Sequence, residues 1–137
     1  MLTDKIALVT GAGRGIGKAI AAELAANGAY VIVNYNGSVK AAEDTVSEIV
    51  AAGGKAEAMQ CDVSDFEACG EMINAIVEKH GHVDILVNNA GITRDGLLMK
   101  MSEEDFDRVL DINLKGTFNT IRHLSRQMLK QRSGKII

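Results

Sequence analysis

A chain of 137 residues, of which 47% are hydrophobic, is long enough to form one domain with a buried core. The formal net charge of −3, from 15 basic and 18 acidic residues, argues against a nucleic-acid-binding protein, because such proteins neutralise phosphates with lysine and arginine. No apolar run approaches the roughly 18 residues that a membrane span needs, and residues 1–5 do not begin a signal peptide, so we expect a cytoplasmic protein without membrane contact.

Short apolar runs predict the strands of a sheet. Residues 6–9, 31–33 and 85–87 are continuously apolar, which is typical of parallel strands covered on both faces. Residues 56–61 mix polar and apolar side chains instead, and predict an edge strand with one wetter side. Residues 135–137 look like the start of a fifth strand.

Helical periodicity fills the segments between these runs. Ser64 and Glu67 have the spacing of a capping box at the start of a third helix. A longer fourth helix is predicted from Ser102 towards Arg132. The predicted inner faces are Ile16, Ala19, Ile20 and Leu24 in the first helix, Val39, Ala42, Val46, Ile49 and Val50 in the second, and Phe66, Cys69, Ile73, Ile76 and Val77 in the third.

This alternation of strands and helices predicts an α/β fold, a Rossmann-type doubly wound parallel sheet with right-handed crossovers. The order βαβαβαβα plus the start of a fifth strand is an incomplete version of that sheet. We therefore interpret residues 1–137 as the N-terminal dinucleotide-binding portion of a single Rossmann-fold domain, without its C-terminal catalytic portion.

A glycine-rich loop joins the first predicted strand to the first predicted helix. Glycines here let the backbone approach a diphosphate, and the helix N-terminus offers unpaired N–H groups and a positive dipole end. The spacing Gly11-x-x-x-Gly15-x-Gly17 departs from the strict G-x-G-x-x-G pattern. A tight turn without a ligand is the alternative, which this strand–loop–helix setting disfavours. The candidate cofactor contacts in the loop are Gly11, Ala12, Gly13, Arg14, Gly15, Ile16 and Gly17.

The end of the second predicted strand bears on the choice of dinucleotide. An acidic residue about 20 positions past the glycines would hold the ribose 2′-hydroxyl of NAD, but the segment 34–38, Asn-Tyr-Asn-Gly-Ser, has no carboxylate. Arg14 supplies a cation for a 2′-phosphate, with a solvated loop residue as the alternative. The pattern favours NADP(H), and Asn36 is a further candidate contact.

Four short motifs follow one another along the chain: Thr10-Gly11-x-x-x-Gly15-x-Gly17, Cys61-Asp62-Val63, Asn88-Asn89-Ala90-Gly91 and Asp111-Ile112-Asn113-Leu114. In order and spacing they resemble the short-chain dehydrogenase/reductase family over the whole chain. Within that family, segment 83–95 is most similar to bacterial 3-oxoacyl-[acyl-carrier-protein] reductases. The resemblance implies reduction of a 3-oxoacyl thioester by NADPH in fatty-acid synthesis.

The resemblance also implies roles for single residues. Asp62 would accept a hydrogen bond from the adenine amino group, and Val63 would pack beside the ring. Asn89 and the backbone of Ala90 and Gly91 would line the cofactor's ribose.

Asn113 would be the outermost member of the family's catalytic Asn-Ser-Tyr-Lys set, holding a water that relays protons to the lysine. A buried asparagine in mid-helix is otherwise unfavourable, and a polar residue at a helix kink is the alternative. The family's serine, tyrosine and lysine would follow the strand that begins at 135; the tyrosine acts as acid, the lysine lowers its pKa and the serine orients the substrate oxygen. Tyr30 and Tyr35 have no lysine four positions on, so we expect a polypeptide ending at Ile137 to be inactive.

Two other functions stay open: a reductase of another carbonyl, such as acetoacetyl-CoA, a sugar or a steroid, and a non-catalytic nucleotide-binding or assembly module. The resemblance implies an acyl-carrier-protein-linked substrate with a possible contact at Arg132, which would alternatively only favour the helix dipole. We also expect a homo-oligomer, dimer or tetramer, in which Phe118, Ile121 and Leu124 divide between core and partner.

The remaining candidates for chemistry predict no metal site. His80 and His82 flank Gly81 after the third helix. Positive charge is favourable at the C-terminus of a helix, which explains the two histidines without a metal. Cys61 and Cys69 are more typical of core thiols than of a disulfide or a metal site.

Overall fold

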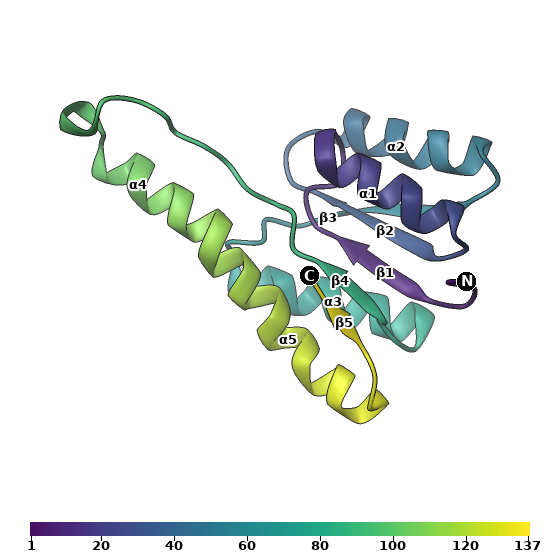
Figure 1. The fold of residues 1–137 in the computed structure, drawn as a ribbon. Helices are drawn as coiled ribbons and strands as arrows, with labels where there is room; N and C mark the ends of the chain where they lie inside the picture. Colours follow the sequence, from purple (N-terminus) through teal and green to yellow (C-terminus); the bar gives the residue numbers. More distant parts are fainter.

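The computed structural model describes residues 1–137, in which strands and helices alternate as predicted and a fifth strand follows (Figure 1). The strands are β1 (Ile6–Val9), β2 (Tyr30–Tyr35), β3 (Lys55–Gln60), β4 (Ile85–Val87) and β5 (Lys135–Ile136). The helices are α1 (Gly15–Ala26), α2 (Val39–Ala51), α3 (Phe66–His80), α4 (Glu103–Leu110) and α5 (Gly116–Gln131). A 3-10 turn at Leu98–Lys100 precedes α4, and a π-helical turn at Asp111–Lys115 joins α4 to α5.

The strands form one parallel sheet in the order β3-β2-β1-β4-β5. This is a Rossmann-type doubly wound sheet, so the predicted fold class is confirmed. β3 lies at an edge, as its mixed sequence predicted. Ligands of such sheets bind outside the carboxyl ends of the strands, where the strand order reverses. A ligand of this sheet would therefore bind against the segments that follow β1 and β4.

Helices cover both faces of the sheet. α1 and α2 lie on one face, and α3 and α5 lie on the other (Figure 1). Along β1, Leu8 packs with the α3 side of the core and Val9 with the α1 side, because successive side chains of a strand point to opposite faces. Both faces of the central strands are thus buried, which explains their continuously apolar sequences.

The buried face of α1 differs from the prediction. Ile16 is 75% exposed, Ala19 is exposed, and Ile20 and Leu24 are only partly buried. The helix instead rests on its smallest side chains, since a glycine or alanine face lets helix and sheet approach closely. Its buried residues are Gly17, Ala21 and Ala25.

The predicted faces of α2 and α3 are correct in their centres and wrong at their ends. Val39 and Val50, at the two ends of α2, are exposed, and so is Phe66 at the start of α3. End residues of a helix lie at the rim of its contact with the sheet. The buried residues are Ala42, Thr45 and Ile49 in α2, and Cys69, Gly70, Met72, Ile73 and Ile76 in α3.

The predicted capping box of Ser64 and Glu67 is wrong. Asp65 is the N-cap of α3, and its Oδ1 accepts the backbone N–H three residues on at 3.0 Å. Ser64 is engaged elsewhere, because its N–H and its Oγ both donate to Asp62 Oδ1, at 3.0 and 2.7 Å.

The predicted long helix is confirmed in extent but is not regular. Ser102 caps α4, and Arg132 ends α5 in a left-handed conformation with φ 56°. Between the two helices, the Gly116 N–H donates to Asp111 O, five residues back. Such a π turn accommodates an extra residue within a helix.

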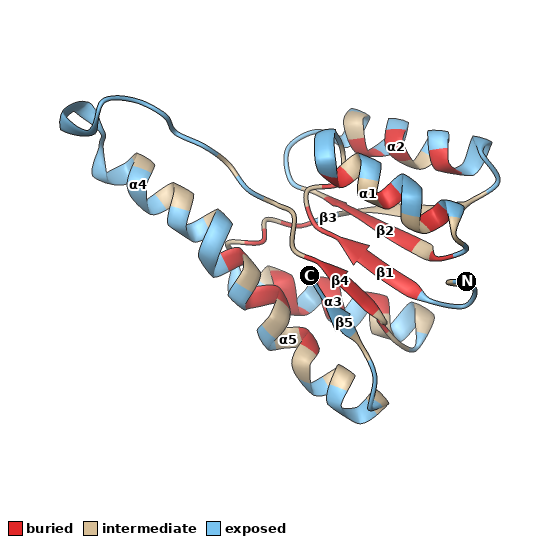
Figure 2. Ribbon diagram, viewed as in Figure 1, coloured by how far each residue is buried: buried red, intermediate tan, exposed pale blue.

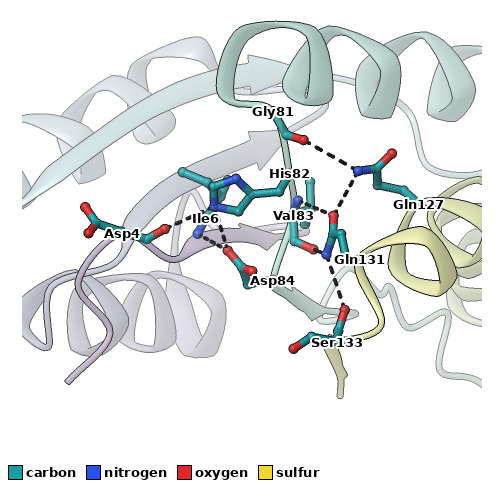
Figure 3. A network of polar contacts seen from close by, with 9 residues as sticks. All are labelled: Asp4, Ile6, Gly81, His82, Val83, Asp84, Gln127, Gln131 and Ser133. Carbon is teal, nitrogen blue, oxygen red and sulfur yellow. Dashed lines mark hydrogen bonds and ion pairs between the residues drawn. The ribbon is translucent and has the colours of Figure 1, made fainter.

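A polar network at the amino end of the strands joins β1, β4 and α5 (Figure 3). Asp84 accepts the Ile6 N–H at 2.8 Å and contacts His82 Nε2 at 3.0 Å. The side-chain amide of Gln131 pairs with the backbone of Val83, accepting its N–H at 3.2 Å and donating to its carbonyl at 2.9 Å. The network fixes the end of α5 beside the start of β4, at the opposite end of the strands from the ligand crevice.

The histidine and cysteine residues considered as metal-site candidates lie in different parts of the structure. His80, the last residue of α3, contacts Glu57 Oε1 through Nε2 at 2.9 Å and lies against the Tyr30 ring. Cys61 and Cys69 are free thiols within the core on the α3 side.

Burial is uneven over the molecule (Figure 2). The central strands are buried, whereas none of residues 93–115, which we call the arm, is buried. The arm consists of the loop after β4, α4 and the π turn, and its loop and α4 extend away from the sheet (Figure 1). None of the helices is both long and apolar enough to cross a membrane.

Candidate functional site

A pocket of about 400 Å³ lies at the carboxyl ends of the strands. Its walls are the glycine loop after β1, the end of β2 with the start of α2, the loop after β3 and the segment after β4. Parallel strands end at the same edge of a sheet, so the fold brings together motifs that are far apart in the sequence. The predicted cofactor residues that line the pocket are Gly11, Gly13, Arg14, Ile16, Asn36, Asp62, Val63, Asn89, Ala90 and Gly91.

The other three predicted loop residues, Ala12, Gly15 and Gly17, do not line the pocket. Ala12 is fully buried. A Cβ on Gly17 would collide with Asn89 Nδ2 and lie 2.5 Å from Gly11 O. Gly11 itself has φ +60°, and a Cβ there would lie 2.9 Å from Ala90 Cα. The glycines thus form a tight backbone cradle at the head of α1, which fits a bound diphosphate.

The N-terminus of α1 adds to this cradle. Arg14 occupies the N-cap position in extended backbone, without a side-chain cap, and the first turn contains no acidic residue. The first N–H groups of the helix and the positive end of its dipole are therefore open to an anion. Arg14 is the one cation and Asp62 the one carboxylate among the lining residues.

Asn89 holds the glycine loop against the end of β4. Its Nδ2 donates to Thr10 O and Gly11 O, both at 3.1 Å. Thr10 Oγ1 in turn accepts the N–H groups of Asn89 and Ala90, at 3.0 and 2.9 Å. The side chain predicted to line the ribose is thus directed at the loop, and the predicted ribose contact of Asn89 stays a prediction.

Asp62 is held in one orientation at the other end of the pocket. Its Oδ1 accepts both hydrogen bonds from Ser64, and its Oδ2 lies 3.6 Å from Arg108 Nη2 on α4. Burial raises the pKa of Asp62, but the hydrogen bonds from Ser64 and the charge of Arg108 outweigh it, so the pKa lies below its ordinary value. Asp62 is therefore an ionised hydrogen-bond acceptor at neutral pH.

Asn113 lies outside this pocket, and its predicted surroundings were wrong in one respect. Asn113 belongs to the π turn, which projects it towards the loop after β4 instead of into the core. The residue is therefore exposed, where the sequence predicted a buried one. Its Oδ1 accepts the Ile92 N–H at 2.8 Å, and its Nδ2 donates to Ile92 O at 2.9 Å. Asn113 and residues 90–94 line a neighbouring pocket of about 530 Å³. Its catalytic role stays a prediction.

Several residues of the site were missed from the sequence. Asn34, the buried residue near the end of β2, lines the pocket and contacts the glycine loop. Ser38 caps α2 at the pocket wall, and Arg108 reaches Asp62 from a distant helix. The serine after a glycine was a readable N-cap signal, whereas the pairing of Arg108 with Asp62 has no signature in the sequence.

The profile of the short chain dehydrogenase family matches residues 5–137, nearly the whole chain. The chain belongs to the short-chain dehydrogenase/reductase family.

Curated members of this family are similar along nearly the full chain. A 3-oxoacyl-[acyl-carrier-protein] reductase FabG of Staphylococcus epidermidis is 54% identical over 98% of the chain and 55% of its own length. FabG of Staphylococcus aureus is 53% identical over 100% of the chain and 56% of its own length. A 3-oxoacyl-[acyl-carrier-protein] reductase of Synechocystis is 51% identical over 99% of the chain and 55% of its own length. The chain spans about half the length of these relatives. The resemblance inferred from the motifs is confirmed.

Solved structures of the family share the fold. A metagenomic short-chain oxidoreductase, solved in complex with NADP, superposes with a TM-score of 0.94 at 38% identity and covers 98% of this chain and 61% of its own. A short chain dehydrogenase from Mycobacterium avium has a TM-score of 0.90 at 42% identity, over 98% of this chain and 52% of its own.

Proposed function

We propose that the protein containing this chain is an NADPH-dependent reductase that converts 3-oxoacyl-acyl carrier protein to the 3-hydroxyacyl form in fatty-acid synthesis. The observation that carries the proposal is the pocket at the sheet edge, whose walls combine a phosphate cradle, an ionised adenine acceptor and a single cation. The names of relatives more than half identical to the chain support the choice of substrate.

Different residues of the pocket would hold different parts of the cofactor. Gly11, Gly13 and the head of α1 would hold the diphosphate, and Asp62 with Val63 would hold the adenine. Ala90 and Gly91 would approach the ribose, and both also border the pocket that contains Asn113. Bound NADPH supplies the hydride for the reduction. Within this chain, Asn113 holds the backbone of Ile92, which lines both pockets.

The activity is tested on the full-length protein by following NADPH oxidation with acetoacetyl-acyl carrier protein, acetoacetyl-CoA, a sugar ketone and a steroid ketone. We expect the carrier-protein substrate to have the highest kcat/KM. We also propose that Arg132, exposed at the end of α5, contacts the acidic carrier protein. Arg132→Asn keeps a residue that tolerates the left-handed backbone and should raise KM for the carrier-protein substrate alone. Turnover of only the sugar or steroid would contradict the proposal.

Cofactor preference gives a separate test of the pocket. Tyr35 stands where a carboxylate would hold NAD, and Arg14 stands beside the same pocket. NADPH should therefore bind more tightly than NADH. Tyr35→Asp should erode the preference and Arg14→Ala should weaken NADPH alone, each by about 1–3 kcal/mol, the scale of a charge-assisted hydrogen bond.

Titration calorimetry of both cofactors against the full-length protein measures these changes. Tyr35→Asn is the matched control, because it removes the ring without adding charge and should leave the preference closer to that of the unmodified protein. Equal affinities of the unmodified protein for NADPH and NADH would contradict the assignment.

We further propose a homo-oligomer that associates through the long helix. Leu124 is fully buried and belongs to the core, Ile121 is partly buried against it, and Phe118 is 56% exposed. The expected division between core and partner therefore runs between Ile121 and Phe118, and Leu114, 67% exposed, continues the outer side. Covering these side chains would remove apolar surface from water.

A further inference from the structure

Asn34 is the one polar residue buried within a strand of the sheet. It stands second from the end of β2 and is 2% exposed. A buried amide without partners would be costly, and this one is fully engaged. Its Oδ1 accepts the Gly11 N–H at 3.2 Å, and its Nδ2 lies within donating distance of Cys61 O at 3.2 Å and Met59 O at 3.3 Å.

These contacts reach two different parts of the pocket. Gly11 opens the glycine loop after β1, and Cys61 immediately precedes Asp62 in the loop after β3. The backbone carbonyl of Asn34 also accepts the Ala12 N–H at 2.9 Å, so the residue holds the glycine loop from both its side chain and its main chain. Tyr35 O at 3.5 Å and Met72 Sδ at 3.6 Å complete the surroundings of Nδ2.

The chemistry of the contacts requires an amide. The glycine loop presents an N–H and needs an acceptor, while the loop after β3 presents carbonyls and needs a donor. An asparagine side chain carries both at the ends of one short rigid group. A carboxylate would lose the donor, and an apolar side chain would leave the facing groups without partners.

We propose that Asn34 is a positioning residue that sets the glycine loop and the loop after β3 at the separation that a dinucleotide requires. It acts through Gly11 on the diphosphate and through Cys61 on Asp62. The inference rests on the proposed function, because it assumes that the pocket holds a dinucleotide.

The experiment compares Asn34→Asp with the unmodified full-length protein, using NADPH and NADH as probes at several pH values. The introduced carboxyl has the shape of the amide but no donor when ionised. The variant's dissociation constants for NADPH and NADH at about pH 8 should therefore be raised about 10- to 100-fold relative to the unmodified protein. The ratio should fall as the pH is lowered, because burial raises the pKa of the new carboxyl and its protonated form donates again. Other ionisable groups on the facing segments are Arg14, Tyr35, Cys61 and Asp62, and they are common to both proteins.

Two further variants separate positioning from a loss of stability. Ile32→Ala removes a fully buried side chain two residues earlier in β2, so it should lower the midpoint of denaturation but change both dissociation constants less than about 3-fold. Asn34→Ser keeps a donor and an acceptor on a single oxygen, on a side chain shorter than the amide, and should bind with intermediate affinity. It carries the test if Asn34→Asp does not fold.

The outcomes are distinguishable. Binding by Asn34→Asp and Asn34→Ser within about 3-fold of the unmodified protein at every pH would overturn the inference and leave the proposed function intact. A loss that is independent of pH and no larger than that of Ile32→Ala would overturn it equally. Failure of the unmodified protein to bind either nucleotide would instead refute the proposed function.

Discussion

The sheet with its covering helices and the arm of residues 93–115 are held in opposite ways. In the sheet, residues from α1, α2 and α3 close two continuous apolar clusters over the central strands. In the arm, Phe106, Leu110 and Leu114 are 54%, 41% and 67% exposed, although they repeat with helical spacing. An apolar helical face indicates burial, but it does not show which surface covers it. The two regions should therefore respond differently to the same substitutions.

The largest contrast should come from two leucines. Leu124 of α5 is fully buried between the helix and the sheet, whereas Leu98 of the arm is 85% exposed. Leu124→Ala should lower the free energy of unfolding by about 2–5 kcal/mol, because it removes packed atoms and leaves a cavity. Leu98→Ala should change it by less than about 0.5 kcal/mol. Urea titration of both variants measures the difference, and equal effects would refute the division into two regions.

Glycines test the same division at a smaller scale. A Cβ on Gly17 would meet Asn89 Nδ2 and the backbone of the glycine loop, whereas a Cβ on Gly96 in the arm would have no neighbour within 4 Å. Gly17→Ala should cost about 1–3 kcal/mol of stability through overpacking and should also weaken nucleotide binding, while Gly96→Ala should do neither. Thermal unfolding with and without NADPH provides both measurements. Stability and affinity unchanged in Gly17→Ala would mean that the loop and α1 are not in close contact.

An ion pair at the far edge of the sheet has a smaller effect that depends on pH. Glu57 on β3 contacts Lys79 Nζ at 2.6 Å and His80 Nε2 at 2.9 Å. Burial raises the pKa of Glu57, but the hydrogen bonds from His80 and Lys79 outweigh this effect. The pKa therefore lies below its ordinary value of 4.5. The ionised form is thus favoured by folding. Its contribution to stability is present above about pH 4.5 and is lost as the pH falls through the lower pKa of the folded state.

Glu57→Gln should therefore reduce the free energy of unfolding by about 1 kcal/mol at neutral pH. The difference from the unmodified protein should shrink as the pH is lowered below 4.5. Glu78→Gln, on the exposed side of α3, is the matched control and should show no such trend. Denaturant titrations at several pH values provide the test, and a difference that persists undiminished in acid would contradict the ion-pair explanation.

The smallest effect on protomer stability, and the one most specific to the arm, concerns association. Replacing Leu114 by serine should change the protomer's stability by no more than about 0.5 kcal/mol but should shift sedimentation of the full-length protein towards smaller species. The matched control replaces Val50 of α2, which is 55% exposed, by serine and should not alter assembly. An unmodified protein that sediments as a monomer at micromolar concentration would refute the proposed oligomer.

The sequence was sufficient for the fold because its strongest signals were local. Apolar runs gave the central strands, and the glycine loop gave the junction of β1 and α1. The predicted inner face of α1 was wrong because the prediction selected the most hydrophobic residues, such as Ile16. Close packing against the sheet instead buries Gly17 and the alanines. The predicted burial of residues at the helix ends was wrong because a periodic pattern does not show where the contact with the sheet stops.

The candidate site was predictable where a motif carries it and not where contacts cross between elements. Most of the predicted cofactor residues line one pocket, because the motifs follow strands of one parallel sheet. Asn34 was overlooked since a polar residue at the end of an apolar strand is typical of a turn. The clamp between Asn113 and Ile92 depends on the projection of the π turn, which no spacing in the sequence indicates.

The π turn also bears on how the length of the chain can change. Removing one residue from a regular helix rotates everything beyond it by about 100°, which would carry buried side chains such as Leu124 out of the core. Removing one residue from 111–115 would instead convert the π turn into an ordinary helical turn, with α4 and α5 keeping their faces. The position that tolerates a deletion is therefore the one that holds Asn113 against Ile92. A shortened relative would keep its fold and lose that clamp.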